Sequence, residues 1–523
     1  MNYPVWDVAF GAGLLIATVA IIHVFVSHFA VGGGLFLVVT ERKARRNGDT
    51  KLLDWLKFHS KFFVLVTVVF GVVTGVGIWF TIGLINPTAT SDLIHIYVWG
   101  WAIEWVFFFT EISAALFYLY GWDKLDARVH QWFGWIYFIA AFASLVVING
   151  IITFMLTSGS WVKNHQFWSG FFNPTYFPSL ALRFAICLAL AGVYALITAS
   201  VQKDKALKAR IVRWSALWIV PSLAMMPAFG WWYIHQIPSH VWASARGPMP
   251  TATDFAHYAV ILLVVAFALA LISLIKPARM HLAFSLLIAL VALGTMGSFE
   301  FVRESVRLPY VIDNYLYANS IYASPVPGDG GFNLEKIKQA GVLKTAKWVK
   351  TRELTPENQV AVGREVFRVD CESCHTTDEY RGVKELLTLR QWDQAKTQTM
   401  LGVLYLMHNN VMPPFAGNNA EQAALAAFLY SLEPTRAREA GPPDGHTVFV
   451  HNCAMCHEPR KNDYLFKYLP KDPATAIKAL EHLPNLFPLM PDLKLSAAER
   501  TALVQWVNTR RGIAAHAAGQ GGN

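Results

Sequence analysis

The sequence predicts an all-α protein: a polytopic bundle of about eight membrane-spanning helices, followed by two small helical domains. Hydrophobic residues make up 54% of the 523-residue chain, and nearly all of the long apolar runs lie before residue 303. A helix needs about 20 apolar residues to cross a bilayer, and these runs are of that order. After residue 303 the chain is more polar and contains a repeated cysteine motif, CESCH and CAMCH.

Eight apolar stretches are long enough to span a membrane. They are residues 8–39, 62–85, 95–120, 133–157, 178–200, 212–234, 255–275 and 281–302. Lys and Arg collect in alternate loops, and loops rich in these residues remain in the cytoplasm. The basic loops are residues 41–51, 123–128, 202–210 and 276–279. This alternation predicts a multi-pass protein of a bacterial inner membrane, with both termini on the periplasmic side.

The net charge of +9 does not indicate a nucleic-acid partner. The basic residues before residue 303 lie in short loops between apolar runs, where they report membrane orientation. The first apolar stretch is too long for a cleavable signal peptide and is followed by a basic segment. We therefore expect it to remain as a span.

The polar part of the chain contains an internal repeat. GREVFRVDCESCH, residues 363–375, and GHTVFVHNCAMCH, residues 445–457, share the pattern G-x3-F-x3-C-x2-C-H. Each is followed by a helix with apolar periodicity, at residues 420–432 and 497–507. The predicted parts of the chain are a membrane domain at residues 1–312, a linker at 313–355, and two repeat domains at 356–436 and 437–523.

The C-x-x-C-H motif predicts covalent haem, in which the two thiols bond to the haem vinyl groups and the adjacent histidine reaches the iron. Two haems c are expected, held by Cys371, Cys374, His375, Cys453, Cys456 and His457. C-x-x-C also occurs in zinc and thiol-redox sites, but the shared flanking residues favour haem. The fifth cysteine, Cys187, lies alone in an apolar stretch. Haem c is attached outside the bacterial cytoplasm, which agrees with the charge pattern of the loops.

Both repeats resemble small class I cytochromes c. In that family the sixth iron ligand is a methionine in a Pro-flanked loop before the last helix. The resemblance implies that Met412, in NNVMPPF, and Met490, in PLMPDL, are the sixth ligands. Met400 and Met407 are alternatives in the first repeat, although neither is flanked by proline.

Among the residues of the apolar stretches are His23, His28, Glu104 and Glu111, and ionisable groups at such positions commonly have a function. His23 and His28 are five residues apart, so on a helix they point about 140° apart and cannot easily share a partner. Each is either a haem ligand or a packed polar residue. Glu104 and Glu111 are seven residues apart, which places them on one helix face about 10 Å apart. They indicate a proton route or a shielded charge beside a cofactor, or else simple pairing with a nearby Trp or Tyr.

The membrane stretches also contain a set of short patterns. They are His23 with Gly32 and Glu41, GVVTG at 71–75, AIE…FFFTE…GWDKL at 102–125, Asn149-Gly150, Asn173-Pro174 and ESVRLPY at 304–310. On these patterns, about 300 residues of the chain resemble subunit I of the cytochrome bd quinol oxidases.

This resemblance implies roles for five residues. His23 would be an axial ligand of the oxygen-reducing high-spin haem, and Glu304 would ligate a neighbouring high-spin haem b. Arg307 would hold haem propionate charge. Glu104 and Glu111 would match the family's two glutamates of the third span, at a spacing one residue shorter. Two non-covalent membrane haems, of type b or d, are therefore expected.

The chain departs from the family where a quinol oxidase binds its low-spin haem b and its quinol. Arg183 stands at the place of a haem-ligating histidine. The second ligand, a methionine, is also missing, and His257 or Tyr258 stands nearby. The external loop at residues 235–253 is much shorter than the family's quinol-binding loop.

Three functions remain open. In the first, a membrane-bound oxidase takes electrons through the two c haems and reduces O2 at the membrane haems, with protons arriving through Glu104 and Glu111. In the second, the protein passes electrons between a quinone or partner subunit and a periplasmic cytochrome, without oxygen chemistry. In the third, the membrane part only anchors a dihaem cytochrome. A second membrane subunit is expected as a partner, because the related oxidases have two subunits.

Overall fold

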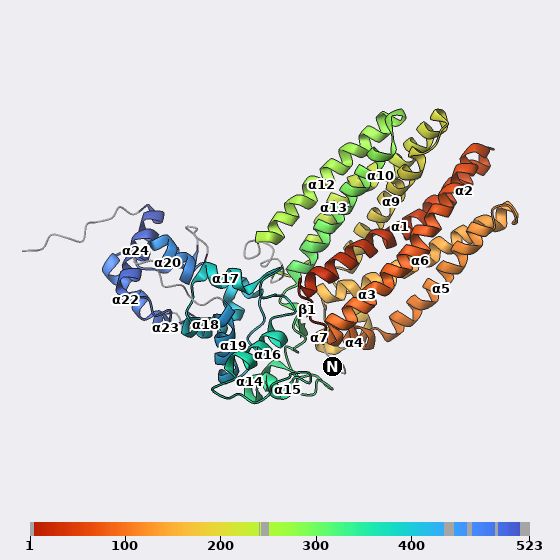
Figure 1. Cartoon of the computed structure of the whole chain (residues 1–523). Helices are drawn as coiled ribbons and strands as arrows, with labels where there is room; N and C mark the ends of the chain where they lie inside the picture. Colours follow the sequence, from red (N-terminus) through yellow and green to blue (C-terminus); the bar gives the residue numbers. More distant parts are fainter. Residues whose placement is uncertain are drawn as a thin grey trace, which may run out of the picture. The chain divides into compact units, whose positions relative to one another are not determined.

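The computed structural model describes residues 5–239, 241, 250–432, 444–457, 463–486 and 490–512. These residues are almost wholly helical and divide into two compact units (Figure 1). The first unit comprises residues 13–320. The second comprises residues 321–512 together with the N-terminal segment 5–12. The predicted all-α class is confirmed.

Eight helical segments in the described residues are long and apolar enough to cross a membrane, as predicted. They are α1 (Ala12–Arg46), the continuous α2 (Thr50–Val64), η1 (Leu65–Phe70) and α3 (Gly71–Ile85), then α5 (Val98–Tyr120), α6 (Ala127–Leu156), α9 (Tyr176–Ser200), α10 (Lys205–Gln236), α12 (Pro250–Ile275) and α13 (Leu282–Arg307). Short helices connect them: α4 (Pro87–Ile96), α7 (Trp161–Asn164), α8 (Phe167–Phe171) and η2 (Pro277–Arg279). The chain is a multi-pass membrane protein.

Helix α9 is the most buried of these helices, because small residues cover much of its surface. It lies directly against α1 at Gly32. A Cβ atom on Gly32 would come 1.8 Å from the carbonyl oxygen of Cys187, so only glycine allows this approach. The crossing brings the polar residues of α1 and α9 onto facing surfaces.

A short hairpin follows the last span. Its strands are β1 (Tyr310–Ile312) and β2 (Leu316–Tyr317), and the rings of Tyr310 and Tyr317 stack at 4.8 Å. The amide of Asp313 donates to the carbonyl of Met155, and the side chain of Asn86 donates to the carbonyl of Ala318. Residues 313–320, the start of the predicted linker, therefore pack with the membrane unit.

The second unit contains the two repeats. Its helices are α14 (Leu334–Ala340), α15 (Val342–Thr345), α16 (Gln359–Asp370), α17 (Val383–Arg390), α18 (Gln394–Leu401), η3 (Leu404–Asn410), α19 (Asn419–Leu432), α20 (Gly445–Asn452), α21 (Tyr464–Tyr468), α22 (Pro473–Glu481), α23 (Leu483–Leu486) and α24 (Ala497–Arg511). Helix α16 packs on α19 in the first repeat, and α20 packs on α24 in the second. The proposed boundary between the repeat domains, at residues 436 and 437, lies outside the described residues.

The glycine of the repeated motif has the same task in both repeats. A Cβ atom on Gly363 would lie 2.0 Å from the carbonyl oxygen of Ala424, and one on Gly445 would lie 2.1 Å from that of Ala502. Glycine thus lets the helix that carries the cysteines cross the C-terminal helix of its repeat at close range.

The remainder of the predicted linker is folded onto the first repeat. Ile321 and Ile337 belong to the hydrophobic core of that repeat. The buried carboxylate of Glu421 accepts hydrogen bonds from the amides of Val342, at 2.9 Å, and Leu343, at 3.0 Å. Residues 321–355 are therefore part of the second unit rather than a free connection.

Candidate functional site

His23 lies on α1 and faces α3. Its Nδ1 is 3.1 Å from the hydroxyl of Thr74. A Cβ atom on Gly75 would come 3.1 Å from Cε1 of the ring, so this glycine makes room for the imidazole. The ring also hydrogen-bonds to the backbone of Gly71, whose carbonyl accepts the hydroxyl of Thr74. A ring oriented through Nδ1 fits the geometry of a haem ligand that binds iron through Nε2.

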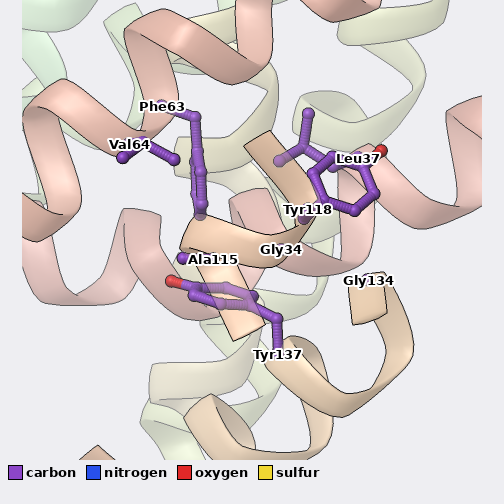
Figure 2. A pocket seen from close by; sticks show the side chains of 8 residues that line it. All are labelled: Gly34, Leu37, Phe63, Val64, Ala115, Tyr118, Gly134 and Tyr137. Atoms are coloured by element: carbon purple, nitrogen blue, oxygen red, sulfur yellow. The ribbon is translucent and has the colours of Figure 1, made fainter. Parts of the chain in front are cut away.

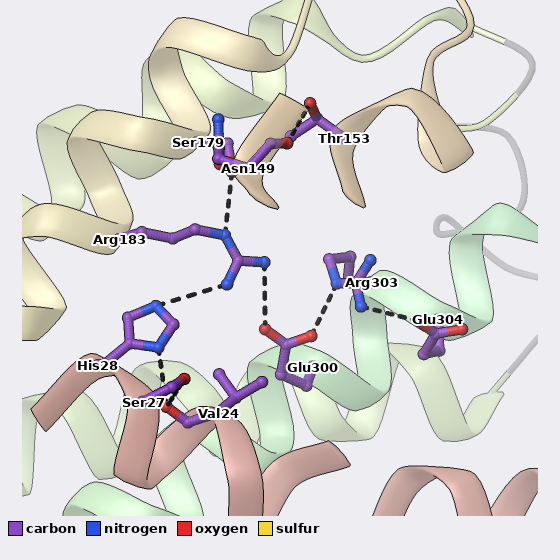
Figure 3. Close-up of polar contacts among 10 residues, drawn as sticks. All are labelled: Val24, Ser27, His28, Asn149, Thr153, Ser179, Arg183, Glu300, Arg303 and Glu304. Carbon is purple, nitrogen blue, oxygen red and sulfur yellow. Dashed lines mark hydrogen bonds and ion pairs between the residues drawn. The ribbon is translucent and has the colours of Figure 1, made fainter. Parts of the chain in front are cut away.

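His28, on the same helix, faces a different partner. Its side chain is buried, and Nδ1 lies 2.8 Å from the carbonyl of Val24. Nε2 lies 3.4 Å from a terminal nitrogen of Arg183, on α9 (Figure 3). Both ring nitrogens are thus occupied, which favours the second interpretation of this histidine, a packed polar residue.

Arg183 is the centre of a buried polar network that joins α1, α6, α9 and α13 (Figure 3). Its guanidinium lies 3.6 Å from the carboxylate of Glu300, and its Nε donates to the hydroxyl of Ser179 at 3.3 Å. Ser179 in turn donates to the side-chain oxygen of Asn149, at 2.8 Å. An arginine in a membrane interior is stable only if it is paired in this way.

The network continues along the last turns of α13, where charges of opposite sign alternate. Arg303 donates to Glu300 at 2.7 Å and to Glu304 at 2.8 Å, and Arg307 donates to the other oxygen of Glu304. Each carboxylate is therefore held between two arginines. This arrangement explains how four ionised residues are accommodated at the end of an apolar helix.

Glu304 and Arg307, predicted as an iron ligand and a propionate partner, are engaged with one another in this structure. The side chain of Glu304 is 38% exposed. Each of its oxygens accepts one hydrogen bond from an arginine, so an iron at Glu304 would share the carboxylate with these ion pairs. The two residues are close together, as the sequence predicts, and their haem-binding roles stay predictions.

Glu104 and Glu111 lie on one face of α5, as predicted, and both face α6. Glu104 accepts a hydrogen bond from the hydroxyl of Ser144, at 3.2 Å. Glu111 accepts one from Tyr137, at 3.0 Å. Each carboxyl group therefore has one hydroxyl partner, and both groups are partly buried at membrane depth. Hydroxyl partners suit either proton transfer or simple pairing, the two alternatives that the sequence left open.

The two C-x-x-C-H motifs adopt the same turn. The amide of His375 donates to the carbonyl of Cys371, and that of His457 donates to Cys453, at 2.8 and 2.9 Å. Nδ1 of His457 is bonded to Asp463, whereas its Nε2 is buried without a hydrogen-bond partner in the described residues. A buried, unsatisfied nitrogen next to two cysteines fits an iron ligand.

Burial affects the titration of these motifs. It lowers the pKa of His375 below its ordinary value, which favours the neutral ring that a metal requires. It also raises the pKa of the Cys453 thiol to about 12. A neutral imidazole at His375 is consistent with an iron ligand.

The predicted sixth ligands all lie near the second repeat. Met412 and Met490 pack against a hydrophobic cluster that contains Cys453, and Met400 and Met407 are buried within it. The cluster around Cys371 includes no methionine among the described residues. The assignment of Met412 to the first haem therefore stays a prediction, with Met400 and Met407 as alternatives.

Comparison with known proteins finds a match for two segments of the chain. Residues 12–240 match the family model of cytochrome bd terminal oxidase subunit I, and residues 440–507 match that of cbb3-type cytochrome c oxidase subunit III. The chain joins a cytochrome bd subunit I-like membrane domain to a cytochrome c domain. The structure of bd oxidase from Geobacillus thermodenitrificans has a similar fold. It has a TM-score of 0.51 and 15% identity, and the similarity covers 57% of this chain and 87% of that chain. No curated protein matches the chain.

These matches confirm the predicted resemblance and make the chain a respiratory haem oxidoreductase of the membrane. The cytochrome c domain indicates covalent haem c, and the bd-like domain indicates membrane haems. In the bd-like domain, Arg183 does not fit as a ligand of a low-spin haem, because a guanidinium carries no free lone pair and this one is already paired. His257 and Tyr258 are exposed on α12 and make no contact with Arg183.

Sequence reasoning missed a buried cluster around Glu41 in the bd-like domain. Glu41 accepts hydrogen bonds from His130 at 2.9 Å, from Tyr118 at 2.9 Å and from Arg45 at 2.6 Å. Only the pairing with Arg45, four residues away, could have been expected from helix spacing. His130 is distant in sequence and carries no motif that would reveal its partner.

A small cavity lies beside this cluster (Figure 2). It is lined by Gly34, Leu37, Phe63, Val64, Ala115, Tyr118, Gly134 and Tyr137. The hydroxyls of Tyr118 and Tyr137 lie on opposite sides of it and point towards Glu41 and Glu111 respectively. Because the lining is almost entirely carbon, the cavity offers a water too few partners to connect the two glutamates.

Proposed function

We propose that this protein is an oxygen-reducing membrane oxidase that receives electrons through its c haems rather than directly from quinol. The observation that carries this proposal is the position of Arg183. Its guanidinium is paired with Glu300 and faces His28, where the related quinol oxidases have a histidine ligand of their low-spin haem. A chain that lacks this haem needs another route for electrons, and the C-x-x-C-H repeats supply one.

Within the membrane unit, His23 would hold a haem through Nε2. The hydroxyl of Thr74 orients the ring by its contact with Nδ1, as the outer partners of metal-binding histidines commonly do. A high-spin haem, when bound, supplies the iron at which O2 is reduced. Glu304 would ligate a second membrane haem after exchanging one of its arginine partners, and Arg307 would then face a propionate.

Glu104 and Glu111 would carry protons toward the oxygen site. Ser144 and Tyr137 hold the two carboxyl groups on the side of α5 that faces α6. Hydroxyl groups can both donate and accept a proton, which suits a relay between carboxyl groups. O2 is the proposed oxidant, and a second membrane subunit is the expected partner.

On the soluble side, each repeat would hold one haem c through its two cysteines and its histidine. The loop charges favour a periplasmic location for both termini and both repeats. The electron donor would then be a periplasmic carrier. Protease added to intact spheroplasts should remove the haem-staining part of the chain, and protection of that part would overturn this topology.

A second candidate is an electron-transfer protein that links a quinone or partner subunit to a periplasmic cytochrome. The pairing of Glu304 with both Arg303 and Arg307 favours it, because these ion pairs compete with iron for the carboxylate. Oxygen consumption separates the two candidates. The purified protein should contain two haems c and two non-covalent haems by pyridine haemochrome, and should consume O2 with reduced cytochrome c. Turnover with quinol alone, blocked by quinone analogues, would overturn the proposed electron entry.

A further inference from the structure

The two C-x-x-C-H repeats place different acceptors on Nδ1 of their histidines. In each repeat the partner is six residues after the histidine. His375 donates to the backbone carbonyl of Arg381, at 2.9 Å, whereas His457 donates to the carboxylate of Asp463, at 2.8 Å. The repeats are thus equivalent in their motif and different in the charge behind the iron ligand.

Local structure holds both acceptors in place. Arg381 has a left-handed backbone with φ of 55°, in the turn between His375 and α17. Asp463 is the N-cap of α21, and the oxygen that faces His457 also accepts the amide of Leu465, at 2.9 Å. The side chains of His457 and Asp463 are only 13% and 12% exposed. A capped and largely buried carboxylate is not an incidental surface contact.

The difference has a chemical consequence for a haem bound at Nε2. A hydrogen bond to a carboxylate is stronger than one to a neutral carbonyl. It draws the Nδ1 proton away from the ring and makes the imidazole a more basic ligand. A more basic ligand stabilises ferric iron relative to ferrous iron, and hydrogen bonding of this kind is one of the means by which a protein sets a haem potential.

We propose that Asp463 lowers the reduction potential of the haem in the second repeat below that of the haem in the first. This inference rests on the proposed function, in that both repeats are taken to carry haem c. With haem bound in both repeats, one electron would pass downhill from ferrous iron in the second repeat to ferric iron in the first. A reduced external carrier would then re-reduce the haem of the second repeat. Asp463 acts through His457 and is a positioning residue.

The connectivity of the chain agrees with this direction. Both of the segments that lead to the membrane unit pack on the first repeat. Asp7, shortly before α1, lies 3.7 Å from Arg364, and residues 321–355 supply part of the core of that repeat. In sequence the first repeat lies between the membrane unit and the second repeat, which is the order of the proposed electron flow.

The test is a spectroscopic redox titration of the full-length haem-loaded protein. Asp463→Asn should raise the lower of the two c-haem potentials and leave the higher one unchanged. The expected change is about tenfold in the electron partition between the haems, or about 59 mV for a one-electron couple. Asparagine keeps the N-cap of α21, so folding should be preserved. Asp463→Glu retains a carboxylate, so its lower haem potential should differ less from that of the parent protein than the potential of Asp463→Asn does. If Asp463→Asn loses haem, Asp463→Ser offers a neutral N-cap with the same expectation.

Asp472→Asn is the matched control. Asp472 is the N-cap of the next helix, α22, where it accepts the amide of Thr475 at 2.8 Å. The Asp472→Asn substitution removes one negative charge from the same repeat at a residue that does not contact His457. It should leave both haem potentials unchanged. Equal shifts in the two variants, no shift in Asp463→Asn, or a shift in the higher potential would each overturn the inference. Oxygen uptake on the same samples tests the proposed function separately: potentials that respond to Asp463→Asn without oxygen uptake would keep this inference and overturn the oxidase.

Discussion

The guanidinium of Arg183 lies 3.6 Å from the carboxylate of Glu300, and the two side chains are only 7% and 10% exposed. They belong to α9 and α13 and lie inside the membrane bundle, where an unpaired charge would be costly. The pair ties the fifth and eighth spans together.

The first prediction concerns the strength of this pair. Arg183→Met should destabilise the protein by about 3 kcal/mol, the lower end of the range for breaking a buried ion pair, because Glu300 keeps Arg303 as a partner. Arg183→Met with Glu300→Gln should be less destabilising than the sum of the two single changes. Thermal unfolding in detergent measures both effects. Lys51→Met, which removes an exposed partner of Asp204, is the control and should change stability little. If the stability loss of the double variant equals the sum of the losses of the two single variants, the pairing is contradicted.

The second prediction compares the two histidines of α1. His23→Ala should lose one membrane haem and all oxygen uptake, while the c haems remain reducible, because His23 is the proposed iron ligand of that haem. His28→Ala should keep the haem content and lower only the thermal stability, since both nitrogens of His28 are bonded within the protein. Haem inventory and an oxygen electrode give both readouts. Normal oxygen uptake in His23→Ala would favour the electron-transfer candidate.

The third prediction concerns proton delivery. Glu111→Gln should slow oxygen consumption by about 100-fold, at the lower end of the usual contribution of a positioned proton donor. Glu104→Gln should act in the same direction. Tyr137→Phe removes the hydroxyl that faces Glu111 and should give a smaller loss. Asp123→Asn, in an exposed loop, is the control. The c haems should be reduced normally in all of these variants. If oxygen consumption is unchanged in both Glu104→Gln and Glu111→Gln, the two glutamates serve only as hydrogen-bond partners of their neighbours.

The fourth prediction assigns the methionine ligands. Met490→Ala should abolish the weak far-red absorption of a thioether-ligated ferric haem in the second repeat and lower its potential, because thioether ligation raises haem potentials. Met412→Ala should do the same for the first repeat. Met400→Ala and Met407→Ala are the matched comparisons, since these side chains are buried in the same cluster. An unchanged spectrum in Met412→Ala would transfer the assignment to Met400 or Met407.

The sequence by itself determined the eight spans, their order and the repeat of the C-x-x-C-H motif. Each of these depends on residues that are adjacent along the chain. A run of about 20 apolar residues is recognisable wherever it packs. A cysteine pair followed by histidine is likewise complete within five residues. The sequence also shows the glycine of the repeated motif. Only the tertiary structure explains it, because Gly363 and Gly445 lie close to the carbonyl oxygens of Ala424 and Ala502.

Only the tertiary structure decided which polar residues meet. His28 could have been a haem ligand, but the crossing of α1 and α9 at Gly32 gives it Arg183 as a partner. The contact of His130 with Glu41 also depends on how the helices pack. So do the different hydrogen-bond acceptors at Nδ1 of His375 and His457. The physical reason is that hydrophobicity and covalent motifs act locally, whereas an ion pair or hydrogen bond depends on how helices rotate and cross. A shift of one residue turns a side chain by about 100° and changes its partner.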